Sequence, residues 1–94
     1  MPRSLILAAL LAALALPAQA ACYADYKAKR DRPLQLHYGV IELPDAACTP
    51  ETARGEISRR IGGDGWKLLN VLGIFGADGL NARRTDAGAY FLRY

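Results

Sequence analysis

Apolar and polar residues alternate along two neighbouring segments, which is typical of β-strands with one solvent-facing side. In residues 22–30 every second position, from Cys22 to Ala28, is apolar, and most of the intervening positions are charged. Asp31-Arg32-Pro33 has the composition of a turn, and residues 34–43 alternate again. The two segments therefore predict an antiparallel β-hairpin.

The second segment changes phase partway along its length. Leu36 and Tyr38 fall on one parity, whereas Ile41 and Leu43 fall on the other. A β-bulge at Gly39 would reconcile the two halves.

A helix is predicted to follow this hairpin. Thr49-Pro50-Glu51 combines a hydroxyl N-cap, a proline at the first helical position and an acid in the first turn. Ala53, Ile57 and Ile61 recur every four residues and form a narrow apolar stripe. Gly62-Gly63 is expected to end the helix.

The remaining segments predict two more strands. Residues 66–75 are apolar on both parities, as in a strand covered on both faces. Residues 76–88, rich in Gly, Asp and Arg, indicate a loop, and residues 89–94 indicate a closing strand. The expected fold is α+β, with the order β-β-α-β-β and a four-stranded antiparallel sheet carrying one helix on one face.

The second half of the chain resembles a family of small bacterial domains of unknown function. The family's helix ends in Gly-x-x-Gly-Trp and is followed by Glu-Leu-Val-x-Val and a closing strand of the type Tyr-x-Phe-x-Arg. Gly62, Gly65 and Trp66 fit this pattern, but Lys67 replaces the usual Glu and the connection 76–88 is longer than the family's hairpin. The resemblance covers residues 50–94 and implies a sheet with one packed helix, but no activity.

The N-terminal segment has the features of a cleaved signal peptide. Arg3 precedes an unbroken apolar run from Leu5 to Leu16, and Ala18-Gln19-Ala20 matches the small-x-small cleavage pattern. The run is too short to span a bilayer, and the polar Gln19 before Cys22 disfavours lipidation of that cysteine. Residues 1–20 are therefore predicted to be removed, leaving residues 21–94 as a single small exported domain.

Removal of this leader changes the composition. The whole chain carries 12 bases and 9 acids and is 52% apolar, but residues 21–94 hold 11 bases and 9 acids. A strongly basic nucleic-acid binder is excluded by this balance. Cys22 and Cys48 are then the only cysteines, and an oxidising compartment such as the periplasm predicts a disulfide between them.

Catalytic motifs are not evident in the sequence. The single histidine, His37, shares a parity with Gln35 opposite Leu36 and Tyr38, which predicts a surface position with no orienting partner. No nucleophile elbow, phosphate-binding loop or metal-ligand spacing accompanies it. The sequence therefore indicates no enzyme, no cofactor and no metal.

Two surfaces are candidates for binding. An uncovered sheet face would expose an apolar patch, unless segments 44–48 and 76–88 fold over it. Basic side chains form two clusters that either contact anionic surfaces or serve solubility. The candidate interface residues are Trp66, Leu69, Val71, Phe75 and Phe91, and the candidate anion contacts are Lys27, Lys29, Arg30, Arg32, Arg83 and Arg84.

These features favour an exported protein-interaction or structural module, acting on an unknown protein partner or on a second copy. The alternatives are a small ligand-binding domain or enzyme using His37, and peripheral binding to anionic envelope surfaces. Neither a transmembrane span nor nucleic-acid binding is expected.

Overall fold

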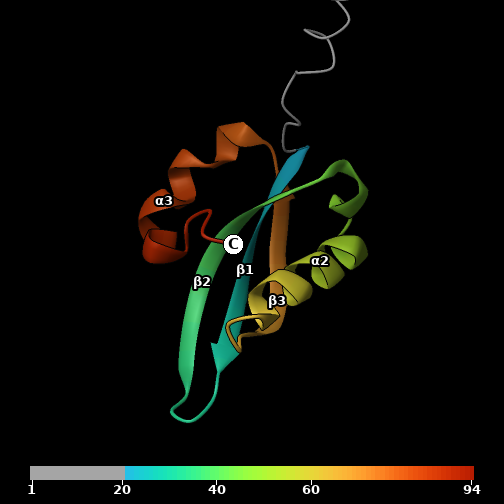
Figure 1. The fold of residues 1–94 in the computed structure, drawn as a ribbon. Coiled ribbons are helices and arrows are strands. Elements are labelled where there is room, and N and C mark those ends of the chain that lie inside the picture. The colour runs from blue at the N-terminus through green and yellow to red at the C-terminus, as the bar shows by residue number, and fades with distance from the viewer. Residues whose placement is uncertain (1–20) are drawn as a thin grey trace, which may run out of the picture.

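The computed structural model describes residues 21–94, so the predicted signal peptide lies outside the described residues. The described part is α+β, with three antiparallel strands and two helices (Figure 1). Three short 3-10 turns, η1 (Asp45–Ala47), η2 (Ala77–Gly79) and η3 (Gly88–Tyr90), join or follow them. The strands are β1 (Cys22–Arg30), β2 (Gln35–Leu43) and β3 (Lys67–Phe75), and the helices are α2 (Pro50–Gly62) and α3 (Asn81–Ala87).

The sheet has β1 at its centre, with the order β2-β1-β3 and antiparallel pairing on both sides. The β1–β2 register runs from Cys22 opposite Leu43 to Arg30 opposite Gln35 without a break. The bulge expected at Gly39 is therefore absent, and the register shifts lie in the β1–β3 pairing instead. An unbroken β2 places His37 on the same face as Ile41 and Leu43.

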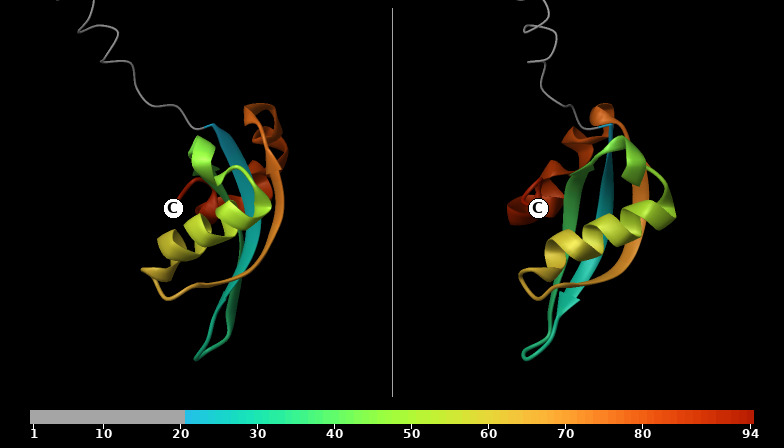
Figure 2. Two further views of the ribbon diagram at one scale, coloured as in Figure 1. Left: turned by 90° about the vertical axis from the view of Figure 1, so that its right-hand side faces the viewer. Right: turned by 45° about the vertical axis from the view of Figure 1, so that its right-hand side comes forward.

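Helix α2 covers this face of the sheet (Figure 2). It begins as the sequence predicted, because the Thr49 side chain accepts a hydrogen bond from the backbone amide of Thr52 and Pro50 occupies the first turn. Its stripe of Ala53, Ile57 and Ile61 is completely buried. These residues pack on fully buried β1 and β2 side chains, including Ala24, Tyr26, Ala28 and Ile41.

The C-terminal part departs from the predicted fold, because residues 76–88 form η2 and α3 rather than an open loop. Asn81–Ala87 contains neither Gly nor Pro, and Gly88, with a φ of 52°, ends the helix. The glycines on both sides suggested a loop, but the seven residues between them have adequate helix propensity.

The predicted fourth strand over residues 89–94 is not formed. Residues 88–90 are a 3-10 turn, and only Phe91 makes an isolated parallel bridge, to Val40 at the outer edge of β2. Leu92 has a φ of 55°, which interrupts extended backbone at that point. The chain instead wraps around this edge, from α3 on one face of the sheet to the aromatic residues packed on the other (Figure 2).

Candidate functional site

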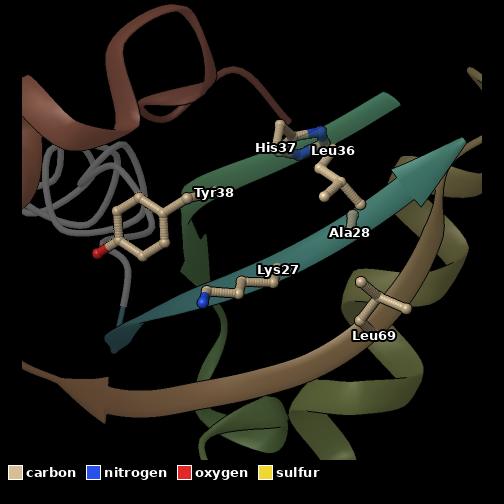
Figure 3. A pocket seen from close by; sticks show the side chains of 6 residues that line it. All are labelled: Lys27, Ala28, Leu36, His37, Tyr38 and Leu69. Carbon is tan, nitrogen blue, oxygen red and sulfur yellow. The ribbon is translucent and has the colours of Figure 1, made fainter. Parts of the chain in front are cut away.

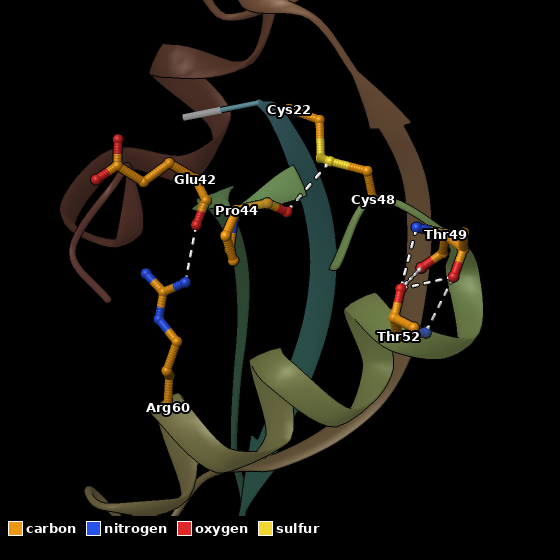
Figure 4. Close-up of a disulfide and its surroundings, with 7 residues drawn as sticks. All are labelled: Cys22, Glu42, Pro44, Cys48, Thr49, Thr52 and Arg60. Carbon is orange, nitrogen blue, oxygen red and sulfur yellow. Dashed lines mark hydrogen bonds between the residues drawn. A yellow bond between two sulfur atoms is a disulfide. The ribbon is translucent and has the colours of Figure 1, made fainter. Parts of the chain in front are cut away.

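A disulfide joins Cys22 at the start of β1 to Cys48, just before α2 (Figure 4). The two Cα atoms are 6.1 Å apart, and 26 positions separate the residues in sequence. The predicted pairing is therefore confirmed. It fixes the N-terminal end of α2 beside the first residue of the central strand.

His37 lies at the centre of an aromatic cluster under α2 rather than on the surface. Only 7% of its surface is exposed, and its Nε2 shares a 2.9 Å hydrogen bond with the hydroxyl of Tyr26. The Tyr90 ring stacks on the imidazole at 3.8 Å, and the Trp66 ring meets it edge-on at 4.3 Å. The predicted surface position of His37 is wrong. Because β2 has no bulge at Gly39, His37 lies on the same buried face of the sheet as Ile41.

The surroundings of His37 favour its neutral form. Burial, together with the charges of Arg30 and Arg93, lowers the pKa of His37 to about 4. Its Nδ1 has no hydrogen-bonding partner among the described residues. Protonation would therefore bury a cation and leave a ring nitrogen of that cation unpaired.

The same cluster holds the C-terminus against the sheet. The Tyr94 ring lies parallel to that of Tyr90, its hydroxyl donates to Asp64 at 2.7 Å, and its backbone oxygen accepts from Arg60 of α2. Burial and the bond to Asp64 raise the pKa of Tyr94. The final residues thus contribute to the core cluster, in which His37 is a packing element.

Gly39 provides the space that the Tyr26 ring occupies. A Cβ at this position would lie 2.6 Å from Cζ of Tyr26, whose side chain is completely buried. We expect Gly39→Ala to lower the free energy of unfolding by about 1–3 kcal/mol through overpacking, as measured by urea denaturation. Gly55→Ala is the matched control, because a Cβ on Gly55 meets nothing and alanine is expected to stabilise the helix by up to about 1 kcal/mol. Equal midpoints for the two variants would contradict this account of Gly39.

A second polar group lies on the opposite face, where α3 covers one end of the sheet. Oδ2 of Asp25 accepts a 3.0 Å bond from Nε of Arg83 in α3 and a 2.9 Å bond from the Tyr38 hydroxyl. Burial and the bond to Asp25 raise the pKa of Tyr38 to about 12. The Arg83 guanidinium also lies 3.8 Å above the Phe75 ring, so these contacts fix α3 on the sheet.

The other end of this face is open and contains a shallow hollow of about 280 Å³ (Figure 3). Leu36 and Leu69 approach it from the two outer strands, with exposed fractions of 65% and 46%. Lys27 also lines it, from the central strand β1. The remaining lining residues are Ala28, His37 and Tyr38.

The predicted interface residues do not form one surface. Trp66 is only 5% exposed and belongs to the aromatic cluster, and Val71 packs against the core under α2. Phe75 and Phe91 are half-buried and lie beneath the guanidinium groups of Arg83 and Arg84. Leu69 alone of the five has a largely exposed side chain.

The basic candidates separate into two groups in the structure. Arg83 and Arg84 are engaged within the fold, and Arg30 binds Oε1 of Gln35 and stacks on Trp66. The other candidates are exposed or half-exposed at the hairpin end of the sheet. They are Lys27, Lys29 and Arg32.

The outer edge of β3 is the remaining open feature. Within residues 21–94, β3 pairs with β1 on one side, and its other side forms no backbone pairing. Its sequence Lys-Leu-Leu-Asn-Val-Leu-Gly-Ile-Phe carries one charge, and Leu69 and Leu72 are each 46% exposed. Unpaired apolar edges of this kind are suited to pairing with another strand.

Among residues 21–94, no three His, Cys, Asp or Glu side chains are grouped so as to hold a metal ion. In the same range no helix is both long and apolar enough to cross a membrane. The described chain is thus a small disulfide-linked α+β domain with an open sheet edge. Comparisons with family models, curated proteins and solved structures found no match to it, so the resemblance over residues 50–94 stays a prediction.

Proposed function

We propose that this chain is an exported protein-interaction module that acts by binding rather than by catalysis. The observation that carries the proposal is the open apolar edge of β3, where Leu69 and Leu72 are exposed. Such an edge offers a row of backbone donors and acceptors to an incoming strand.

A second copy of the chain is the simplest partner for this edge. Two β3 strands related by a two-fold axis can pair antiparallel and join two three-stranded sheets into one continuous sheet. The exposed leucines would then contact their counterparts across the axis. Because Lys67 is the one charged residue among the nine of β3, electrostatic repulsion between two paired β3 strands would be small.

The environment of His37 supports binding over catalysis. The ring is buried, stacked by Tyr90 and hydrogen-bonded to Tyr26, so a substrate would have to displace core contacts to reach it. Its lowered pKa of about 4 leaves it neutral near pH 7. These contacts support a structural role for the imidazole.

Export is supported by the leader-like sequence and by the disulfide, which forms readily in an oxidising compartment. Mass spectrometry of the secreted protein tests it directly. We expect an N-terminus at Ala21, and retention of Met1 or a diacylglyceryl group on Cys22 would contradict it.

The dimer is tested by replacing an exposed β3 leucine with a charged residue. We expect the wild type to show a concentration-dependent dimer in sedimentation velocity, and Leu72→Lys to weaken it at least about tenfold, because two like charges would meet near the axis. Leu92→Lys is the matched control, since Leu92 is 39% exposed and lies outside β3. A wild type that stays monomeric at high concentration, or equal weakening by both variants, would overturn the proposed pairing.

A further inference from the structure

The turn end of the β1–β2 hairpin projects beyond the body of the molecule (Figures 1 and 2). Residues 27–36 hold four bases and one acid, whereas the rest of residues 21–94 holds seven bases and eight acids. The net positive charge of the described chain therefore originates at one end. Such an asymmetry orients a protein toward a negatively charged surface.

Two lysines at this end are placed directly opposite each other. Lys29 of β1 pairs with Lys67 of β3, and like charges in that position repel. Asp31 offsets part of this charge, at 3.7 Å from the Lys29 ammonium group. Lys27 and Arg32 are exposed nearby. A bound anion would relieve the repulsion.

Large apolar side chains are exposed among these bases. Leu34 is the last residue of the turn and is 64% exposed. Leu36 and Leu69 line the adjoining hollow with Lys27. Leucines interspersed with lysine and arginine are characteristic of segments that lie in the headgroup region of a membrane.

We propose that this hairpin end is a binding site for anionic phospholipid surfaces, with the bases on the phosphates and the leucines at the acyl boundary. A lipid surface fits better than an acidic protein, because a stable protein interface needs about 1,000 Å² of matched surface. The projecting tip is a narrow two-stranded ribbon, which a fluid headgroup layer can surround. The site shares Leu69 with the β3 edge, but Lys27, Arg32, Leu34 and Leu36 all lie on the hairpin, so lipid binding does not require the edge pairing.

The test is flotation of the exported protein, with its N-terminus checked by mass spectrometry, on vesicles of about 30% phosphatidylglycerol in phosphatidylcholine. We expect binding that weakens with salt and is absent on pure phosphatidylcholine. Lys27→Gln with Arg32→Gln should weaken it roughly 30-fold, from the loss of two surface charges. Leu34→Ser with Leu36→Ser should weaken it severalfold. Circular dichroism confirms that the variants remain folded.

Arg54→Gln with Arg59→Gln is the matched control, because it removes two exposed charges from α2 rather than from the hairpin. Unchanged binding in this control, with loss in the hairpin variants, supports the site. Equal loss in both pairs, no binding to phosphatidylglycerol, or equal binding to neutral vesicles would overturn it. Retention on a polyglutamate resin without vesicle binding would also overturn it and indicate an acidic protein instead.

Discussion

Replacing Cys22 and Cys48 together with alanine is expected to lower the free energy of unfolding by about 3–4 kcal/mol. The bridge closes a segment with a sequence separation of 26, so its removal restores the chain entropy of that loop to the unfolded state. The loss is large for this protein because a domain of this size has little core to offset it. Urea denaturation of the variant and of the oxidised wild type measures the difference.

The double variant avoids a complication of single substitutions, which would leave a reactive free thiol. Reduced wild-type protein is the internal control and should unfold at a midpoint close to that of the double variant. Mass analysis of the oxidised protein should show two hydrogens fewer than the reduced form. A midpoint unchanged by reduction and by substitution would show that the bridge does not stabilise the fold.

The local elements of the first two-thirds of the chain were predictable because their signals are local. Alternation located β1 and β2, and the Thr49 cap, Pro50 and the Ile57–Ile61 stripe located α2 almost to the residue. The disulfide followed from the count of two cysteines. These signals depend on the chain's own periodicity and turn chemistry, which define where each element begins and ends.

The C-terminal third was less predictable because distant contacts determine it. Arg83 of α3 is held by Asp25, 58 positions away in sequence, and Tyr90 is held by His37. Tyr90-Phe91-Leu92 has the apolar and aromatic composition of a strand, but a single bridge forms at Phe91. Stacking of Tyr90 on His37 favours the wrapped conformation over further pairing along β2.

The position of His37 shows that assigning a strand residue to the wrong face of the sheet changes the function inferred for it. Hydrophobicity alone assigns Leu36 to the core in preference to histidine, yet Leu36 is 65% exposed. In the sequence, the alternation of Leu43 and Ile41 continues back through Gly39 to His37, and the unbroken β1–β2 register agrees with this phase. The strand register, rather than side-chain hydrophobicity, therefore determines which face each residue of β2 occupies. The same register places Leu36 on the open face of the sheet.

Acidification is expected to destabilise the protein through His37. The folded-state pKa of about 4 lies below the ordinary value of 6.5, so the unfolded chain binds the proton first as the pH falls. This contribution to stability is complete above about pH 6.5 and is lost progressively down to about pH 4. The loss amounts to about 2–3 kcal/mol, because a tenfold difference in proton affinity between the folded and unfolded chains corresponds to about 1.4 kcal/mol.

His37→Gln separates this effect from the carboxylates that also titrate in acid. The variant should be less stable than the wild type at about pH 7.5, because Gln cannot reproduce the stack on Tyr90 and the bond to Tyr26 together. Between about pH 6.5 and 4 its unfolding free energy should fall by about 2–3 kcal/mol less than that of the wild type. Parallel pH profiles for the two proteins would show that His37 titrates normally and is not enclosed by the aromatic cluster. If the two unfolding free energies converge as the pH falls, the protonation of His37 is coupled to the stability of the aromatic cluster, which includes Tyr90 and Tyr94 of the C-terminal segment.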